Sequence, residues 1–260
     1  MNAQDFEKSL RDIVGSQNVR PDEPLAEHTT FRIGGPAQWL VTPRSEDEVA
    51  AVVSTCEAGG VPWRVLGLGS NVLAPDEGLD GVTLLLADNF ADVEVLPGGL
   101  VRAAAGATNA AVAAVARDTG LAGYEFASGI PGTVGGAAIM NAGAYDGEMA
   151  QVIAWVDCLD ETGASHRLAG DDLALGYRTS CFAQRPWLIT GARLPLTPGD
   201  PAAIRALGEY VHNVRPQLVE SEDETALFVN MSGERMSRQG FWKLIKHYQE
   251  KAGIKKDITP

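Results

Sequence analysis

The sequence contains few cysteines and few histidines, and their spacing excludes several kinds of site. Three cysteines occur in 260 residues, with no Cys-x-x-Cys spacing. This odd, scattered set argues against a disulfide framework and against a zinc site. We expect Cys56, Cys158 and Cys181 to be free, buried thiols. The four histidines are also dispersed along the chain, so no metal centre is expected.

Long apolar runs are also lacking. No stretch of roughly 18 apolar residues exists, so no membrane span is expected. The first ten residues are polar and charged, which is unlike a secretory signal peptide. The chain is therefore expected to be cytoplasmic and not to bind membranes.

Lysine is nearly missing from most of the chain. One of the six lysines lies within residues 1–242, and the other five follow residue 242. Residues 1–206 carry a net charge of −13 and residues 207–260 a net charge of zero, which predicts a boundary near residue 207. The total of −13 argues against nucleic-acid binding through the whole surface. A negative total charge is still compatible with an anionic ligand that is bound by local N–H groups and one or two arginines.

Periodicity predicts a mixed α+β fold. Helices are expected at 3–14, at 109–118, and after Ser45, which forms a capping box with Glu48. Residues 15–28 are polar and are expected to be an extended lead-in. Strands are expected at 39–43, 62–66, 81–86, 93–96, 100–106, 151–160, 166–168 and 187–196. Helices and strands do not alternate strictly, which favours α+β over a parallel βαβ fold.

Two glycine-rich stretches are candidate ligand-binding loops. Gly129–Tyr145 reads GIPGTVGGAAIMNAGAY, and Val65–Leu73 reads VLGLGSNVL. Glycine lets backbone N–H groups approach a ligand closely, and successive N–H groups bind anions such as phosphate. Neither stretch is a Rossmann fingerprint or a P-loop, and each alone is also consistent with a structural glycine turn. No Gly-x-Ser-x-Gly, His-Glu-x-x-His or EF-hand pattern is present.

Four motifs in this order resemble the UDP-N-acetylenolpyruvoylglucosamine reductases (the MurB family). They are Leu66–Leu73 (LGLGSNVL), Gly129–Gly136 (GIPGTVGG), Asn141–Tyr145 (NAGAY) and Gly176–Ser180 (GYRTS). The resemblance covers about residues 20–206. It implies a two-lobed FAD-binding body of the vanillyl-alcohol-oxidase/PCMH type, with lobes at 1–66 and 67–206. It also implies a short strand and a glycine turn at His28–Gly35, and a mixed helical segment follows at 207–260.

The same resemblance implies an oxidoreductase of peptidoglycan synthesis. FAD would take hydride from NADPH and pass it to the enol ether of a UDP-sugar. The FAD-binding residues would be Gly67, Leu68, Gly69, Ser70, Asn71, Ser128, Ile130, Pro131, Gly132, Thr133, Val134, Gly135, Gly136 and Asn141. Tyr177 and Arg178 would contact substrate, and Arg178 matches the family's active-site arginine. Its planar, permanently charged fork suits a substrate carboxylate that becomes an enolate.

Residues 207–260 resemble a different family. Glu209–Leu218 and the run Ser237–Lys243 (SRQGFWK) are similar to the catalytic domain of Xer-type tyrosine recombinases. Ser237 is expected to cap a helix whose apolar side is Phe241, Leu244, Ile245 and Tyr248. A DNA-associated recombinase fragment is therefore one alternative function.

The reductase family's general-acid serine, in a Gly-Ser-x-Phe-Lys-Asn-Pro type segment, and its C-terminal glutamate are not found in this sequence. The recombinase-like residues stand where the resemblance would place the substrate domain, so impaired turnover is expected. A non-catalytic FAD-binding module in a chimeric chain and another oxidase of the same superfamily are further alternatives. The residues leave the oligomeric state open.

Overall fold

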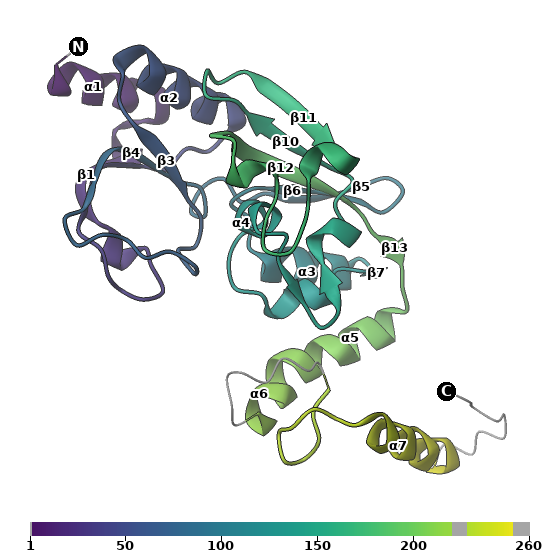
Figure 1. Ribbon diagram of the computed structural model, residues 1–260. Helices are drawn as coiled ribbons and strands as arrows, with labels where there is room; N and C mark the ends of the chain where they lie inside the picture. The colour runs from purple at the N-terminus through teal and green to yellow at the C-terminus, as the bar shows by residue number, and fades with distance from the viewer. Residues whose placement is uncertain (1, 220–227, 252–260) are drawn as a thin grey trace. The chain divides into compact units, whose positions relative to one another are not determined.

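The computed structural model describes residues 2–219 and 228–251. The chain divides into two compact units, Met1–Ile204 and Arg205–Pro260. The larger unit contains two large sheets, two small two-stranded sheets and the helices that cover the large ones (Figure 1).

The first sheet holds four strands in the order β1-β2-β4-β3. They are β1 (Val19–Pro24), β2 (Pro36–Val41), β3 (Trp63–Leu66) and β4 (Leu79–Leu85). Strands β2, β4 and β3 are parallel, and β1 is antiparallel at the edge. Strand β4 extends this sheet beyond the predicted limit of the first lobe at residue 66, because it pairs between β2 and β3.

The expected extended lead-in at 15–28 contains strand β1, whose Pro21 and Pro24 are tolerated because an edge strand does not need every N–H group for pairing. The strand implied within His28–Gly35 does not form. That segment follows a short 3-10 turn, η2 (Leu25–Glu27), and is a turn in which the Thr29 hydroxyl donates to the Ile33 carbonyl at 2.9 Å.

The second sheet is antiparallel and has the order β11-β10-β12-β6-β5. Its strands are β5 (Val93–Leu96), β6 (Leu100–Ala104), β10 (Trp155–Leu159), β11 (Ser165–Ala169) and β12 (Leu188–Pro195). Helices α3 (Asn109–Asp118) and α4 (Val134–Ile139) share a buried apolar cluster with β6 and β12 on one face. We call the other face, which bears Arg102 and Arg193, the outer face.

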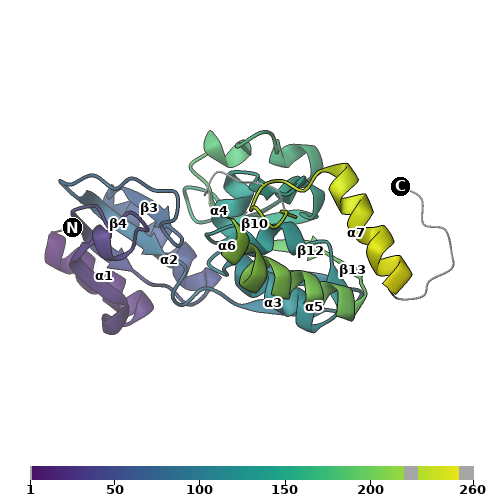
Figure 2. The ribbon, with the colours of Figure 1, turned by 90° about the horizontal axis from the view of Figure 1, so that it is seen from below.

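Helix α2 (Glu46–Gly59) lies at the junction of the two sheets (Figures 1 and 2). Four of its side chains are fully buried and belong to a cluster that also contains residues of β2, β4, β10 and β12: Val49, Val52, Val53 and Cys56. The Ser45 side chain accepts from the Glu48 N–H at 3.2 Å, as predicted. In a capping box the Glu48 carboxylate would accept from the Ser45 N–H. Here it accepts instead from the N–H of the preceding residue, Arg44, at 2.8 Å. Helix α1 (Ala3–Val14) contacts α2 and buries Phe6, Leu10 and Val14.

Short elements connect the sheets to the loops of interest. They are η1 (Ser16–Asn18), β7 (Leu121–Ala122), η3 (Glu125–Gly129), β8 (Gly143–Ala144), β9 (Gly147–Glu148), η4 (Met149–Gln151), η5 (Gly170–Leu173), η6 (Cys181–Ala183) and β13 (Thr197–Pro198). Strands β8 and β9 form a hairpin, and β13 pairs with β7.

The end of the described chain is helical. It comprises α5 (Pro201–Glu209), a π-helical turn η7 (Tyr210–Val214), α6 (Arg215–Leu218) and α7 (Arg238–Lys251). Ser237 caps α7 as predicted, because its hydroxyl accepts from the Gly240 N–H at 3.0 Å. Phe241 and Leu244 remain 39% and 42% exposed, so the expected apolar side is only partly covered. The recombinase-like residues Leu227 and Ala252–Pro260 lie outside the described residues, and that resemblance stays a prediction.

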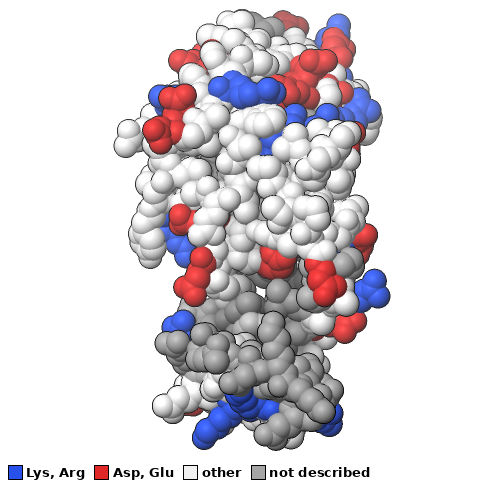
Figure 3. Space-filling view, turned by 90° about the vertical axis from the view of Figure 1, so that its right-hand side faces the viewer, with Lys and Arg blue, Asp and Glu red and all other residues white. Residues whose placement is uncertain are grey.

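The thiols agree in part with the sequence. Cys56 and Cys158 are buried and free, and burial raises the pKa of each thiol to about 12. Cys181 is free but only partly buried, so it differs from the expectation. Among the described helices, none is long and apolar enough to cross a bilayer. At the top of the view in Figure 3, Lys/Arg and Asp/Glu side chains are interspersed rather than gathered by sign.

Candidate functional site

The first glycine loop, Gly67–Asn71, follows directly from buried Leu66 at the end of β3. Gly69 has φ +64°, and a Cβ there would overlap the carbonyl oxygen of His28. Its own carbonyl accepts from the Thr30 N–H at 3.1 Å, which fixes the loop against the turn at His28–Gly35. Only glycine satisfies both the left-handed backbone and this close approach.

The second glycine loop, Ile130–Gly136, turns into α4. Thr133 is the N-cap of this helix. The Val134 and Gly135 N–H groups donate to the carbonyls of Ala107 and Ala105 at 2.8 and 2.9 Å. A Cβ on Gly135 would lie 3.0 Å from the Ala105 Cβ, so this loop packs tightly on the end of β6.

The structure brings the two loops into contact, although more than 50 residues separate them. A Cβ on Gly67 would lie 2.6 Å from the Thr133 hydroxyl, and a Cβ on Gly132 would lie 3.0 Å from the Ser70 hydroxyl. Within the described part of the chain, the N–H groups of Gly67–Asn71 donate to no protein acceptor. These N–H groups and the Ser70 hydroxyl are therefore available as donors next to Thr133.

Asn109 holds the second loop from behind. It is 1% exposed, its side-chain amide donates to the Ile130 carbonyl at 3.3 Å, and its N–H donates to the Gly132 carbonyl at 3.1 Å. The Tyr124 hydroxyl in turn donates to the Asn109 side chain at 2.9 Å, and burial raises the pKa of that phenol. Neither residue belongs to the predicted set. The signal available in sequence was the position of Asn109 directly after the helix-capping Thr108.

Four further predicted cofactor residues have surroundings of other kinds, and their roles stay predictions. The Ser128 hydroxyl donates to the Glu125 carbonyl of its own 3-10 turn at 2.8 Å. Val134 is fully buried in the apolar cluster below the second sheet. Leu68 and Pro131 are exposed.

Arg178 and Tyr177 occupy a tight turn closed by the Gly176–Thr179 bridge. Arg178 has φ +55°, and Tyr177 is 93% exposed. Among the described residues, Arg178 makes no ion pair. No carboxylate among the described residues neutralises its guanidinium. The charge is therefore available to pair with an anionic ligand.

A cavity of about 310 Å³ adjoins this turn, and we call it the Arg178 pocket. Its lining comprises Asn141, Gly143, Ala144, Tyr145, Asp146, Gly147, Glu148, Gln151, Tyr177 and Arg178. Most of it is the β8–β9 hairpin, whose two turn residues Tyr145 and Asp146 both have positive φ. The Asp146-Gly147 pair is typical of hairpin turns, and here Asp146 is the second turn residue while Gly147 begins β9.

Asn141 connects the hairpin to the arginine turn. It is 4% exposed and has φ +40°. Its amide donates to the Gly176 carbonyl at 3.1 Å, and its oxygen accepts from the Ala150 N–H at 2.8 Å. Both functional groups of this side chain therefore have protein partners, one of them in the turn that carries Arg178.

Helix α4 links the glycine loops to the Arg178 pocket. Its six residues span about 9 Å at 1.5 Å per residue. Its N-terminus is at Thr133, and its C-terminus leads to Asn141. The Ser180 hydroxyl donates to the Ile139 carbonyl at 2.7 Å, and so fastens the arginine turn to the end of the helix.

Comparison with known proteins identifies the family. A family model described as an FAD binding domain matches residues 37–169. The UDP-N-acetylenolpyruvoylglucosamine reductase of Clostridioides difficile (strain 630) is 38% identical over 207 residues, which cover 80% of this chain and 68% of the relative. The chain belongs to the UDP-N-acetylenolpyruvoylglucosamine reductase family. It spans about two thirds of the length of that relative.

Solved structures agree with this membership. The MurB reductase of Thermus caldophilus superposes with a TM-score of 0.63 at 27% identity, covering 89% of this chain and 95% of that one. p-Cresol methylhydroxylase superposes with a TM-score of 0.59 at 15% identity, covering 96% of this chain and 64% of that one, and shows the fold alone. The predicted α+β fold of the vanillyl-alcohol-oxidase/PCMH type is confirmed.

Within this reductase family member, two buried asparagines allow a matched test. We expect Asn141→Ala to slow any substrate-dependent step about tenfold while FAD affinity stays within about twofold, since Asn141 supports the Arg178 turn. Asn109→Ala should instead lower FAD affinity, because Asn109 supports the second glycine loop. Each variant loses buried hydrogen bonds, so a lower melting temperature is expected for both.

Flavin titration measures the FAD affinity of each variant, and stopped-flow reoxidation measures the rate of the substrate-dependent step. A larger loss of FAD affinity in Asn141→Ala than in Asn109→Ala would return Asn141 to the predicted cofactor set.

Proposed function

We propose that the chain is a cytoplasmic, FAD-dependent reductase that uses NADPH to convert UDP-N-acetylglucosamine enolpyruvate into UDP-N-acetylmuramate. The observation that carries the proposal is the Arg178 guanidinium, which makes no ion pair among the described residues and lies in a pocket joined by α4 to two touching glycine loops. Membership of the family of UDP-N-acetylenolpyruvoylglucosamine reductases supports it.

The residues present fit FAD. The N–H groups of Gly67–Asn71 and the Ser70 and Thr133 hydroxyls are the donors that a pyrophosphate needs, and the glycines admit it closely. We assign the remaining predicted residues of the second loop, Ile130, Pro131, Gly132, Gly135 and Gly136, to shaping this site. Bound FAD would supply hydride transfer between NADPH and the substrate.

Arg178 would act on the substrate carboxylate. Its planar fork can pair with both carboxylate oxygens and stabilises the negative charge that develops there when hydride reaches the neighbouring double bond. Tyr177, on the same turn, would contact the substrate at the pocket mouth. We expect turnover of the 260-residue chain to be impaired, because its sequence contains no segment matching the family's general-acid serine.

The test is the visible spectrum of the purified chain under anaerobic conditions. We expect a bound-flavin band that bleaches on addition of NADPH. Substrate added to the bleached sample should then reoxidise the flavin slowly. A protein that takes up no FAD would contradict the proposal as a whole. A flavin that bleaches and is never reoxidised by the UDP-sugar would support the alternative of a non-catalytic FAD-binding module.

A further inference from the structure

The outer face of the second sheet carries an unusual pairing of like charges. Arg193 on β12 lies directly opposite Arg102 on β6. Like charges in directly opposed positions destabilise a sheet. Arg167 on β11 joins them on this face, opposite Asp157 on β10.

One carboxylate, that of Asp157, forms ion pairs with two of these arginines. Asp157 accepts from Arg167 Nε at 2.8 Å and from Arg193 Nη1 at 3.0 Å. Arg102 has only a 3.9 Å approach to exposed Glu94. Burial lowers the pKa of Arg193. The charges of Asp157 and Glu46 oppose this shift, and the positive charges of Arg102 and Arg167 add to it. Among the described residues, Arg102 lies farther from a carboxylate than Arg167 and Arg193 do.

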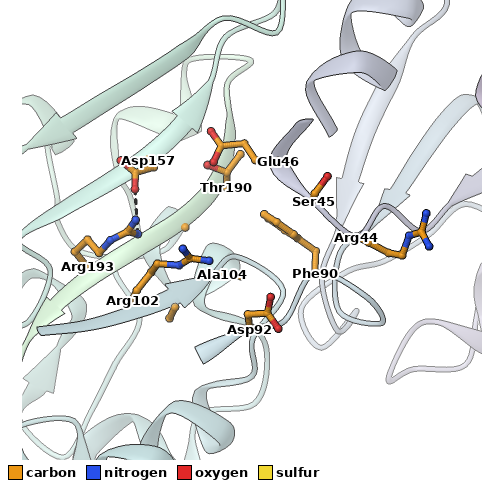
Figure 4. Close-up of a pocket in the computed structure, with 12 residues that line it drawn as sticks. Arg44, Ser45, Glu46, Phe90, Asp92, Arg102, Ala104, Asp157, Thr190 and Arg193 are labelled. Atoms are coloured by element: carbon orange, nitrogen blue, oxygen red, sulfur yellow. Dashed lines mark ion pairs between the residues drawn. The ribbon is translucent and has the colours of Figure 1, made fainter. Parts of the chain in front are cut away.

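Arg102 and Arg193 line a cavity of about 310 Å³ that shares no residue with the Arg178 pocket. Gly191 and Ala104 leave space beside them, since a Cβ on Gly191 would lie 3.6 Å from Arg193 Nη1. Figure 4 shows Arg102 and Arg193 on one side of this space and Phe90 and Ser45 on the other. The Arg44 guanidinium points away, toward its partner Glu48.

Two acidic residues complete the lining. Glu46 stands at the first residue of α2, where its carboxylate accepts from the Ser165 hydroxyl at 3.2 Å, and Asp92 lies beside Phe90. Carboxylates opposite the arginines disfavour a ligand that is anionic throughout. They favour one whose far side carries hydroxyl donors.

We propose that this cavity binds a small hydroxylated anion, such as a sugar phosphate or a hydroxycarboxylic acid. The phosphate or carboxylate lies between Arg102 and Arg193, and the hydroxyls donate to Glu46 and Asp92. The volume is that of a small-molecule site. The bound anion relieves the repulsion between the two opposed arginines. The site is independent of the flavin reaction proposed above.

Calorimetric titration of the full chain tests this site, with excess FAD present to fill the glycine loops. Glucose 6-phosphate and gluconate are the probes, and we expect one of them to bind at one per chain with a dissociation constant of about 1 mM or below. Tighter binding of the first identifies a sugar phosphate, and tighter binding of the second a hydroxy acid. Because the flavin spectrum is recorded on the same sample, failure of FAD binding is seen separately from failure of anion binding.

Three variants decide the location. Arg102→Gln should weaken binding about tenfold or more, because it removes a charge-assisted partner. Ala104→Leu should abolish binding by filling the cavity while every arginine remains. Arg117→Gln, a control on α3 whose arginine pairs with exposed Asp118, should bind like the parent. Absence of binding by the parent chain up to about 10 mM of either probe would overturn the proposal. So would equal affinity in folded Arg102→Gln and Arg117→Gln, with folding checked by circular dichroism.

Discussion

Replacing Arg178 by glutamine should slow flavin reoxidation by substrate about 10²–10³-fold, the cost of losing one donor to a developing oxyanion. Arg178 is exposed on its turn, and no ion pair among the described residues depends on it. The fold and the FAD spectrum should therefore be unchanged. Bleaching by NADPH should also stay within about threefold, because the arginine would act on the substrate carboxylate and not on the flavin.

Arg178→Lys separates charge from geometry. Lysine keeps the positive charge but lacks the planar fork, so we expect it to recover only a small part of the lost rate. Both variants place a non-glycine residue at the same φ of +55°, so backbone strain is equal in the comparison. Arg117→Gln again serves as the distant control.

Single-turnover reoxidation by the UDP-sugar is the measurement, since it isolates the substrate step from flavin reduction. A Gln variant that reoxidises within threefold of the parent would remove Arg178 from the reaction. An equal loss in Arg117→Gln would point to a general effect on folding.

Sequence patterns predicted the elements whose signals are local. The Ser45 cap of α2 and the helix expected at 109–118 each depend on residues within one or two turns, and each forms as predicted. The strand at Val19–Pro24 was predicted only as part of an extended lead-in, because prolines are unusual within a sheet. Its place at a sheet edge, set by pairing with β2, makes those prolines acceptable.

The sequence predicted which residues belong to the site better than it predicted how they are arranged. The order and spacing of the motifs resemble those of the reductase family, and this resemblance assigned Gly67–Asn71 and Ile130–Gly136 to one FAD site. The contact between Gly67 and Thr133 arises from the packing of two sheets and has no local signal. For Asn141, the motif predicts a cofactor-binding residue, and that role stays a prediction. The structure adds that both ends of its side chain bond to protein.

That contact between the loops leads to a second large expected effect. Gly67→Ala should lower FAD affinity by tenfold or more, because its methyl group would lie 2.6 Å from the Thr133 hydroxyl and must push the loops apart. Gly69→Ala should have a larger effect. Its methyl group meets the backbone carbonyl of His28, which cannot rotate away as a side chain can.

A double-mutant cycle distinguishes the two glycines. Thr133→Ala removes the hydroxyl and methyl group that oppose Gly67→Ala, and leaves the Thr133 Cβ at an ordinary 3.5 Å. The cost of Gly67→Ala for FAD binding should therefore shrink in the Thr133→Ala background, relative to Thr133→Ala alone. The cost of Gly69→Ala should stay the same, since its obstacle is elsewhere.

Gly98→Ala controls for backbone strain. Gly98 has φ +83°, close to the left-handed value of Gly69, but a Cβ there would meet nothing within 4 Å. Its alanine should cost about 1–2 kcal/mol of stability and leave FAD affinity unchanged. Fluorescence titration of FAD and thermal unfolding of all variants give both quantities. If Gly98→Ala and Gly69→Ala lost FAD affinity equally, strain alone would account for the effect. If Gly67→Ala were no better tolerated beside Thr133→Ala, the two loops would not meet as the structure places them.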